Sequence, residues 1–298
     1  VIFNVLGTII FTLALPLVHQ AVLWLAHLGG EPVNIRMQIA YAHGLFNTTN
    51  TLIFLPMVGV LAFIVTKLVP GETKELEFGP KYLDQRFLNN PAIALGQAQH
   101  EIIRMAEIAR DSLADAINYF FTKDEQLGSL SQQKELLIND LDKKITEYLV
   151  KVQQSSLSPD ESDKASILLQ AINDIERIGD HAENIVELSE HRITQKVEFS
   201  EDATSELKEM FQLTDQIIAK AIKALEEDNQ ELAGEILEME VELDRMEREY
   251  RKSHIARLNN NLCTGTAGAV FLDILSNLER IGDHAKNIAQ YVIHGEKI

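Results

Sequence analysis

A seven-residue segment occurs twice in this chain without a single change. Residues 176–182 read Glu-Arg-Ile-Gly-Asp-His-Ala, and the same residues recur at 279–285, 103 positions later. An Asn-Ile pair follows each copy at the same distance, at 184–185 and at 287–288. Two unrelated segments would not share seven consecutive residues, so we infer an internal duplication. The period of this duplication constrains the fold, because each copy must form an equivalent structural unit.

Apolar residues on both sides of the repeated segment recur at three- and four-residue intervals, which is typical of amphipathic helices. No proline occurs after Pro159, so long unbroken helices are permitted. Polar or glycine-containing breaks stand at 128–131, 155–160 and 259–261. The spacing predicts one helix that begins near residue 97 and further helices near 132–154, 161–192, 202–228, 230–259 and 266–294. We therefore predict an all-α body of two tandem three-helix bundles, at 97–195 and 200–298.

The first part of the chain is almost uncharged. Residues 1–30 and 37–66 contain no Asp, Glu, Lys or Arg, and a helix needs roughly 20 apolar residues to span a bilayer. The turn Gly29-Gly30-Glu31-Pro32 separates the two runs. We expect residues 1–69 to form a transmembrane helical hairpin, and residues 70–96, with three prolines, to form a linker. Because the chain opens on Val1, we also expect it to be the C-terminal part of a longer protein.

Charge is distributed unevenly along the chain. Of the net charge of −18, the first 70 residues contribute +1 and the remainder −19. The acidic body excludes a basic nucleic-acid footprint and is compatible with cation binding. Lys67, Lys74, Lys81 and Arg86 follow the second apolar run, and the positive-inside rule therefore predicts that residues 70–298 are cytoplasmic and that the apolar helices lie in the cell's inner (plasma) membrane.

Polar side chains follow one face of each apolar run, and the two runs resemble each other at a spacing of 43 residues. The first has Asn4 and Thr8, and the second has Asn47, Asn50 and Thr51. Such side chains either hydrogen-bond neighbouring helices or line a path for an ion or substrate. Both interpretations stay open at this point. Pro16 and Pro56 are expected to interrupt their helices, since proline cannot donate a backbone hydrogen bond.

Each copy of the repeated segment places two carboxylates on one helix face. Glu176 and Asp180 are four residues apart, as are Glu279 and Asp283. Glu240 and Asp244 show the same spacing on the preceding helix of the second bundle. Acidic side chains from neighbouring helices commonly form carboxylate-rich metal sites, and oxygen ligands favour magnesium, calcium, manganese or iron over zinc. The alternative is a solvated acidic face with a purely structural duplication.

The first bundle departs from this pattern. Asp142 and Tyr148 match Asp244 and Tyr250 at a spacing of 102 residues, which puts Ile138 where the second bundle has Glu240. On this alignment we expect the first metal site to be weaker or empty.

Three further residues of the repeated segment carry expectations of their own. Gly179 and Gly282 predict close helix packing or close approach of a ligand, since glycine in a helix costs about 1 kcal/mol relative to alanine. His181 and His284 point off the carboxylate face, so they either support ligands or contact other helices. Arg177 and Arg280 are expected either to pair with the carboxylates of the repeated segment or to contact a phosphate.

The duplicated Glu-Arg-Ile-Gly-Asp-His-Ala resembles the signature of PhoU-type domains. Residues 42–47, Ala-His-Gly-Leu-Phe-Asn, together with Pro56, resemble the closing membrane helices of bacterial sodium/phosphate cotransporters, and the stretch from Tyr82 to Met105 is similar to the segment that leads into their PhoU-like tail. The resemblance covers essentially the whole chain. It implies sodium-driven transport of inorganic phosphate, with sodium as coupling ion and a cytoplasmic tail that regulates it.

The resemblance also implies a metal-binding tail that holds divalent or iron ions. Carried over residue by residue, the ligands are Glu176, Asp180, Glu240, Asp244, Glu279 and Asp283, with Asp142 as a weaker candidate. The family's substrate site uses Gln-Ser-Ser motifs in its membrane repeats, and the apolar part of this chain contains neither. The Gln154-Ser155-Ser156 sequence lies at the end of a charged helix, and we interpret it as a helix stop. The substrate-binding residues are therefore unknown and are expected upstream of this chain.

Two further functions compete with a symporter fragment. One is a membrane-tethered PhoU-like metal-binding or adaptor protein in phosphate homeostasis, and the other is a helical scaffold that docks a partner. In each case we expect no enzyme, no catalytic residue and no nucleic-acid partner. The expected partners are inorganic phosphate, sodium and the lipid bilayer, and a homo-oligomer is compatible with the sequence.

Overall fold

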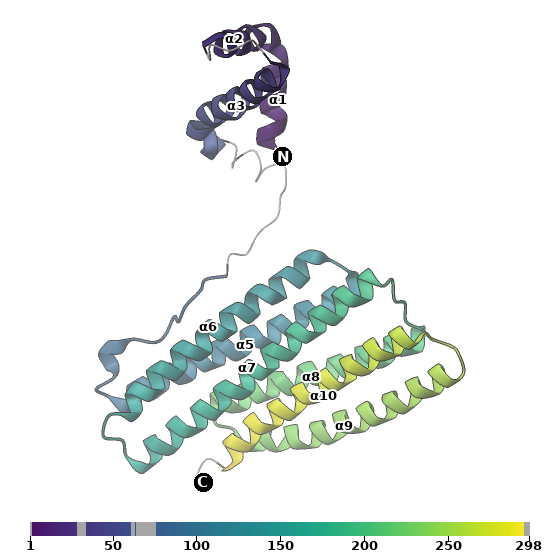
Figure 1. Ribbon diagram of the computed structural model, residues 1–298. Helices are drawn as coiled ribbons and strands as arrows, with labels where there is room; N and C mark the ends of the chain where they lie inside the picture. Colours follow the sequence, from purple (N-terminus) through teal and green to yellow (C-terminus); the bar gives the residue numbers. More distant parts are fainter. Residues whose placement is uncertain (1, 29–33, 61–62, 64–75, 295–298) are drawn as a thin grey trace. The chain divides into compact units, whose positions relative to one another are not determined.

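The computed structural model describes residues 2–28, 34–60, 63 and 76–294, and all regular structure in these ranges is helical (Figure 1). The all-α prediction is therefore confirmed. The chain divides into two compact units, Val1–Glu75 and Leu76–Ile298. The apolar unit contains α1 (Ile2–Leu13), α2 (Leu15–Leu28), α3 (Ile35–Phe54) and the 3₁₀ turn η1 (Leu55–Met57). The bundle unit contains the 3₁₀ turn η2 (Gln85–Phe87), α5 (Pro91–Thr122), α6 (Glu125–Gln153), α7 (Pro159–Thr194), α8 (Glu201–Glu227), α9 (Gln230–Asn259) and α10 (Gly265–His294).

The first apolar run is not one straight helix in the structure. It breaks at Ala14 into α1 and α2, which bend by 86°. Pro16 is the second residue of α2, and proline has no N–H to continue the ladder of α1. Pro56 likewise lies in η1, directly after α3 ends. Both prolines therefore interrupt their helices as expected, while the turn at 29–33 lies outside the described residues.

No single helix in the described ranges is both long and apolar enough to cross a membrane. By length and composition alone, the bent pair Asn4–Leu13 and Leu15–His27 passes as a broken span.

The polar side chains of the apolar unit bond mostly within their own helices. Thr8 Oγ1 donates to the carbonyl of Asn4 at 2.8 Å, and Thr51 Oγ1 donates to the carbonyl of Asn47 at 2.8 Å. Asn50 on α3 is fully buried against Gly7 of α1, where a Cβ would overlap the amide. Neither amide atom of Asn50 has a hydrogen-bond partner among the described residues. Gly7 is thus required for the close packing of α1 on α3.

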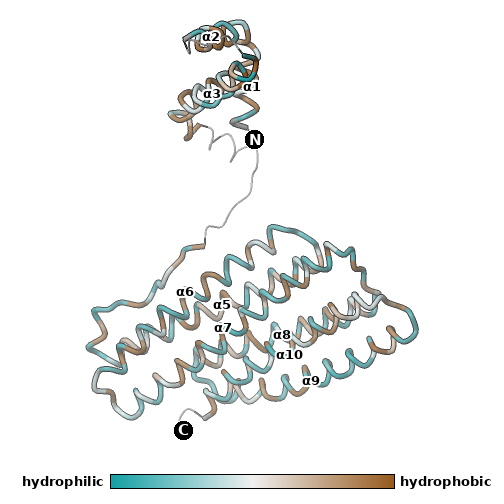
Figure 2. The backbone as a smooth tube through the Cα atoms, in the orientation of Figure 1, coloured by the Kyte–Doolittle hydropathy of each residue, from teal (hydrophilic) through white to brown (hydrophobic). Residues whose placement is uncertain are grey.

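The bundle unit consists of two three-helix bundles, α5–α7 and α8–α10, joined along α7·α10 and α5·α8 (Figure 1). Figure 2 shows apolar and polar residues alternating along each of these helices, as amphipathic helices require. Fully buried apolar side chains from all six helices form one continuous core; Ile102, Leu141 and Ile175 contribute from the first bundle and Leu207, Leu243 and Ile274 from the second. The two bundles therefore share one hydrophobic core and are not separate domains joined by a linker.

Two helix boundaries differ from the sequence pattern. α5 begins at Pro91, with Asn90 as its N-cap, six residues before the expected start. The break expected at 128–131 lies instead at Lys123 and Asp124, where Lys123 adopts φ 62° and the Asp124 side chain accepts from Gln126 N. Gly128 lies inside α6, where a Cβ would be 2.9 Å from the Tyr119 ring.

Candidate functional site

The repeated glycines show which residues of α6 and α9 are equivalent. Gly179 of α7 faces Ile138 of α6, and a Cβ on Gly179 would lie 3.0 Å from Ile138 Cδ1. Gly282 of α10 faces Leu243 of α9 still more closely. Since the two glycines are equivalent, Ile138 corresponds to Leu243, at a spacing of 105 residues. Gly packing was one of the two expectations for these positions, and the structure confirms it.

This register corrects the alignment made from the sequence, which used a spacing of 102. The residue equivalent to Glu240 is Glu135, not Ile138, and both glutamates are buried, with 4% and 8% of their surface exposed. Asn139 corresponds to Asp244, and Asp142 corresponds to Glu247. The sequence comparison therefore missed Glu135. The signal that marks it is the run of buried positions that α6 and α9 share at the new spacing.

The first carboxylate cluster lies between α6 and α7. It contains the predicted Glu176, Asp180 and Asp142, together with the missed Glu135 and with Glu183. Burial raises the pKa of Glu135, and the charges of Glu183, Asp180 and Glu176 raise it further. Burial and then Asp180 raise the pKa of Glu176. The cluster is thus a set of partly desolvated carboxylates that repel one another.

Few cations compensate the first cluster. Arg177 pairs with Asp180 (Nη1 to Oδ2, 3.0 Å) and more loosely with Glu176 (Nε to Oε2, 3.5 Å). Of the two expectations for the repeated arginine, pairing with the acidic stripe is therefore confirmed for this copy. Asn139 Nδ2 donates to Glu135 Oε1.

The second cluster lies between α9 and α10. It brings together all four predicted carboxylates of that bundle and adds Glu247; the predicted four are Glu240, Asp244, Glu279 and Asp283. Burial raises the pKa of Glu279, followed by the charges of Asp283, Asp244 and Glu247.

The two clusters differ in charge because a lysine lies in the second cluster and not in the first. Lys286 Nζ lies 2.8 Å from Glu240 Oε1 and 3.7 Å from Asp283 Oδ1. The equivalent residue of the first bundle is Glu183, which adds a negative charge instead. The second cluster is therefore partly neutralised by Lys286, whereas the cation that pairs with the first cluster is Arg177. The reason for expecting a weaker first site was Ile138 in the place of Glu240, and the register removes that reason because Glu135 is the equivalent residue.

The donors of the first cluster are carboxylate oxygens, the type of ligand that hard cations prefer. As the side chains lie, no three His, Cys, Asp or Glu residues in the described part of the chain converge as a ready metal site. Binding would therefore require the side chains to turn toward a common point.

The two repeated histidines contact helices of the opposite bundle. His181 Nδ1 lies 2.9 Å from Asn277 Oδ1, and His284 Nδ1 lies 2.8 Å from Asp174 Oδ1. Their rings are 5.6 Å apart. Asp174 and Asn277 are equivalent positions of the repeat, so the contact is reciprocal across α7 and α10. Of the two expectations for the histidines, helix–helix contact is the one observed.

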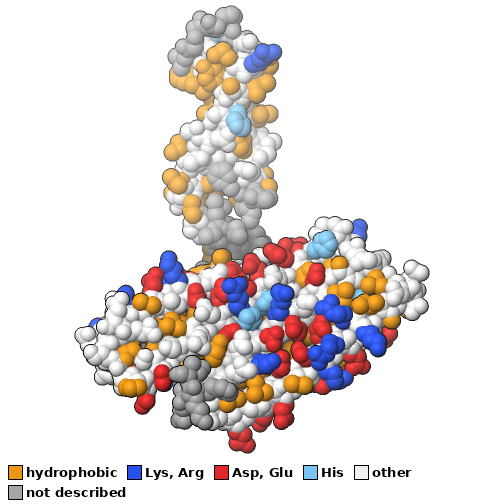
Figure 3. Space-filling model, turned by 60° about the horizontal axis from the view of Figure 1, so that its bottom comes forward, with side chains coloured by type: hydrophobic (Ala, Val, Ile, Leu, Met, Phe, Trp, Pro, Cys, Tyr) orange, Lys and Arg blue, Asp and Glu red, His pale blue; other side chains and the backbone are white. Residues whose placement is uncertain are grey.

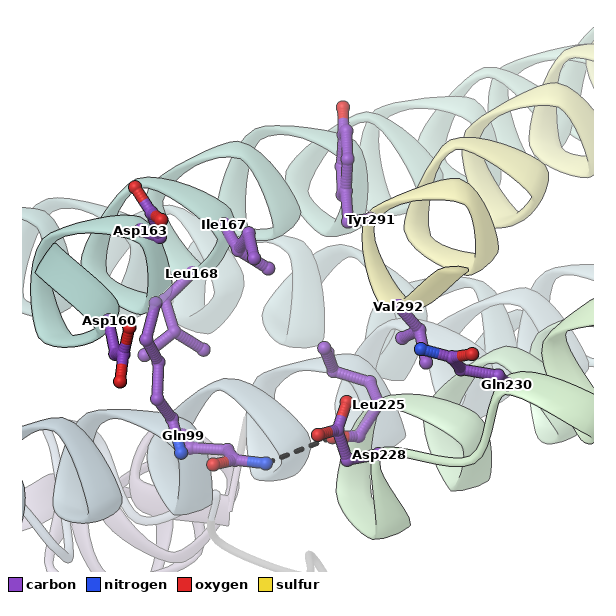
Figure 4. Close-up of a pocket in the computed structure, with 11 residues that line it drawn as sticks. Gln99, Asp160, Asp163, Ile167, Leu168, Leu225, Asp228, Gln230, Tyr291 and Val292 are labelled. Carbon is purple, nitrogen blue, oxygen red and sulfur yellow. Dashed lines mark hydrogen bonds between the residues drawn. The ribbon is translucent and has the colours of Figure 1, made fainter. Parts of the chain in front are cut away.

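A cleft that the sequence did not reveal lies at one end of the α7·α10 contact (Figure 4). It has a volume of about 620 Å³, and none of the predicted ligands lines it. Gln99 Nε2 of α5 donates to the carbonyl of Leu225 at 2.9 Å across its floor. Asp160 and Asp163 stand on the α7 side and Asp228 at the α8–α9 turn.

A second cleft, of about 440 Å³, is lined by Arg280 and by residues of α7 and α10. Figure 3 shows the surface around these helices, where acidic, basic and histidine side chains are interspersed on one face.

Comparison with known proteins places these observations in a family. The PhoU domain model matches residues 102–189 and 207–292, which together make up more than half of the chain. A protein of Thermotoga maritima named "Phosphate-specific transport system accessory protein PhoU homolog 1" is 29% identical over 198 residues, 66% of this chain and 84% of that protein.

A second kind of relative matches the apolar unit as well. The Escherichia coli K12 protein named "Putative inorganic phosphate export protein YjbB" is 22% identical over 300 residues. That match covers 98% of this chain but 53% of the relative, so the chain spans about half the length of this kind of protein.

Solved structures share the fold of the bundle unit. The crystal structure of PhoU from Pseudomonas aeruginosa gives a TM-score of 0.65 at 20% identity, over 68% of this chain and 97% of that one. PhoU from Streptococcus pneumoniae gives 0.64 at 18% identity, over 70% and 97%. With two matched segments on the two bundles of the repeat, the chain belongs to the PhoU domain family.

Proposed function

We propose that the bundle unit regulates the passage of inorganic phosphate by a membrane protein to which the apolar helices belong. The observation that carries this proposal is one similarity, over 98% of the chain, to a relative named as an inorganic phosphate export protein. A PhoU relative named as an accessory protein matches 66% of the chain, and the PhoU domain model matches residues 102–189 and 207–292. Apolar helices and bundles therefore occur together in a phosphate-related relative.

Of the expectations drawn from the sequence, the tethered PhoU-like adaptor in phosphate homeostasis is the better supported. Both kinds of relative are named for phosphate handling, and neither name mentions sodium. Sodium-coupled symport by the longer protein stays a second proposal, which rests on the sequence resemblance to sodium/phosphate cotransporters. We place the apolar helices in the plasma membrane and the bundles in the cytoplasm, on the lysines and arginine that follow residue 66.

The regulatory signal that we propose is a hard cation, of the divalent or iron type, on the first cluster. Glu135, Asp142, Glu176 and Asp180 would hold it, with Glu183 beside them. A bound cation supplies the positive charge that the cluster lacks. The carboxylates of the first cluster come from both α6 and α7, so a cation bound to them would fix these two helices against each other. The proposal involves no bond chemistry, and we propose no enzymatic activity.

The test is phosphate flux through membrane vesicles that contain the longer carrier protein, with and without a sodium gradient. A matched protein that lacks the bundle unit is the control. Flux that changes when the bundle unit is removed supports regulation, and flux that depends on sodium supports the symport proposal. If flux is the same with and without a correctly folded bundle unit, the regulatory proposal is wrong.

A further inference from the structure

The arginine of the repeated segment has different surroundings in its two copies. Arg177 of the first copy pairs with Asp180, with 3.0 Å between Nη1 and Oδ2. Arg280 of the second copy forms no hydrogen bond or salt bridge with any residue that the structure describes, although the seven residues of the segment are identical. Asp283, the counterpart of Asp180, instead lies 3.7 Å from Lys286 Nζ. The guanidinium of Arg280 is therefore available to a ligand.

Arg280 lines the second cleft, of about 440 Å³, together with neutral polar side chains of α7 and α10. Ser276 and Asn277 precede Arg280 by four and three residues, so these side chains share one face of α10. Asn184 of α7 lines the same cleft, and its Nδ2 donates to Asn277 Oδ1 at 3.2 Å. The cleft thus combines one unpaired cation with groups that donate hydrogen bonds.

Two of these neutral groups keep a hydrogen for a ligand. Arg251 Nη2 of α9 lies 2.9 Å from Ser276 Oγ, and since arginine only donates, the serine oxygen accepts this bond. The hydroxyl hydrogen of Ser276 is therefore left to donate. Asn184 Nδ2 carries two hydrogens, of which the bond to Asn277 uses one. A guanidinium beside such donors is the combination by which proteins bind phosphate groups.

The two carboxylates that also line the cleft stand toward its other end. Asp273 precedes Arg280 by seven residues, which is about 10 Å along a helix that rises about 1.5 Å per residue. The reciprocal histidine contacts described above show that α7 and α10 run antiparallel. Glu187 therefore lies still further from Arg280 along the helix axes. The Arg280 end of the cleft is thus its positively charged end.

The equivalent place in the first half of the repeat is not suited to an anion. Asp174 occupies the position of Asn277, and its negative charge opposes an anion there. At the spacing of 105 residues, Thr146 of α6 occupies the position of Arg251. Arg177 is already held by a carboxylate. The second half of the duplication therefore offers a combination of groups that the first half lacks.

We propose that the Arg280 end of this cleft binds a tetrahedral oxyanion, either free inorganic phosphate or the phosphate group of a larger molecule. Arg280 supplies the charge, and Ser276 and Asn184 supply neutral donors. Because Asn184 belongs to the first bundle and Arg280 to the second, the bound anion contacts both bundles at once. As a second regulatory signal this anion rests on the function proposed above, whereas the binding itself does not.

The experiment is titration calorimetry of the full chain in detergent with inorganic phosphate, at a fixed chloride concentration. The unchanged protein binds one equivalent, and Arg280→Gln weakens the affinity by about tenfold or more. The matched Arg177→Gln leaves the affinity unchanged. The proposal is overturned if the unchanged protein binds no phosphate, if a folded Arg280→Gln binds it equally well, or if both variants lose binding to the same extent.

A second variant changes the charge and keeps the contacts between the bundles. Asn277→Asp copies Asp174 of the first half and retains an acceptor for His181 and Asn184. The added negative charge weakens phosphate binding by about fivefold or more. Unchanged affinity in this variant would show that the anion does not lie at the Arg280 end of the cleft.

Adenosine monophosphate distinguishes the two sources of the oxyanion. Tighter binding of inorganic phosphate identifies the free ion as the ligand, and tighter binding of the nucleotide identifies the phosphate group of a larger molecule.

This inference and the proposed function fail separately. Absence of phosphate binding while the bundle unit still changes flux overturns the anion site and leaves the function standing. Phosphate binding that depends on Arg280, with flux unaffected by the bundle unit, supports the site and contradicts the function.

Discussion

Single residues make the two halves of the duplication different. Glu183 and Lys286 occupy equivalent positions, one adding a negative charge to its cluster and the other neutralising two carboxylates. The seven residues in front of this position are identical in the two copies, so on α7 and α10 this exchange is the difference that changes the charge beside the carboxylate pairs. The two copies therefore serve as internal controls for each other.

Removing the lysine should convert the second cluster toward the first. In Lys286→Met, Glu240 and Asp283 lose their cation, and we expect Mn²⁺ affinity at the second cluster to rise about tenfold, the equivalent of about 1.4 kcal/mol. Titration calorimetry of the Asp180→Ala background isolates that site. The reciprocal Glu183→Lys should weaken the first cluster. Equal affinities before and after both changes would show that these side chains do not control binding.

His254 predicts how stability depends on pH. It is buried against the Phe271 ring at 4.1 Å, with Arg257 and Cys263 on its two nitrogens and Glu206 nearby. Burial and then Arg257 lower the pKa of His254, and Glu206 opposes them weakly. Arginine only donates, so Nδ1 accepts from it and the folded protein keeps the ring neutral.

The sign of the effect follows from proton binding. Below its ordinary pKa of 6.5 the unfolded chain protonates His254 while the folded chain does not, so stability falls as the pH falls through that value. His254→Gln should flatten this dependence between about pH 5 and 8, as measured by urea unfolding at several pH values. An unchanged slope in a folded variant would assign the acid sensitivity to other groups.

The packing of neighbouring helices determines how far a side chain at Gly179 or Gly282 destabilises the protein. Gly282→Ala places a methyl group into Leu243, and Gly179→Ala places one 3.0 Å from the end of Ile138. Alanine gains about 1 kcal/mol of helix propensity at each position, while overpacking costs about 1–3 kcal/mol. We expect Gly282→Ala to destabilise by about 1 kcal/mol or more and Gly179→Ala to be closer to neutral. Chemical denaturation of both variants checks the order, and a more stable Gly282→Ala would refute it.

Much of the helical architecture could be predicted from the sequence. The duplication, the six helices of the body and the interruptions at Pro16 and Pro56 follow from spacing and from proline chemistry. The register of α6 against α9 does not, because Leu-Asp pairs at 141–142 and 243–244 produce a local identity at the wrong spacing. What decides the register is the side chain that meets each glycine, and this is a tertiary contact.

The candidate site shows the same division. The paired carboxylates of α7 and α10 are found from their i,i+4 spacing, and the structure puts each pair into a cluster. Glu135 was missed, since its partner residue became visible only with the correct register. The clefts depend on helices far apart in the sequence, and no local pattern marks them.

At the scale of the whole molecule, the two bundles meet through a polar seam as well as through a shared core. Asp174 is buried and accepts from His284, Asn287 and Tyr291, while its equivalent Asn277 accepts from His181 and Asn184. The residues of this seam stand next to both clusters in the sequence. The hydrogen bonds of this seam hold the two bundles in one relative arrangement. A change at either cluster therefore occurs close to the contact between the bundles.

The central claim is that the bundle unit controls phosphate passage through its first cluster. The most direct measurement is the rate of radiolabelled phosphate flux through vesicles that contain the longer carrier protein, with Mn²⁺ on the bundle side. We predict that Asp180→Ala changes the rate about fivefold or more, and that the matched Asp283→Ala changes it far less. Equal rates for both folded variants and the unchanged protein would contradict the account.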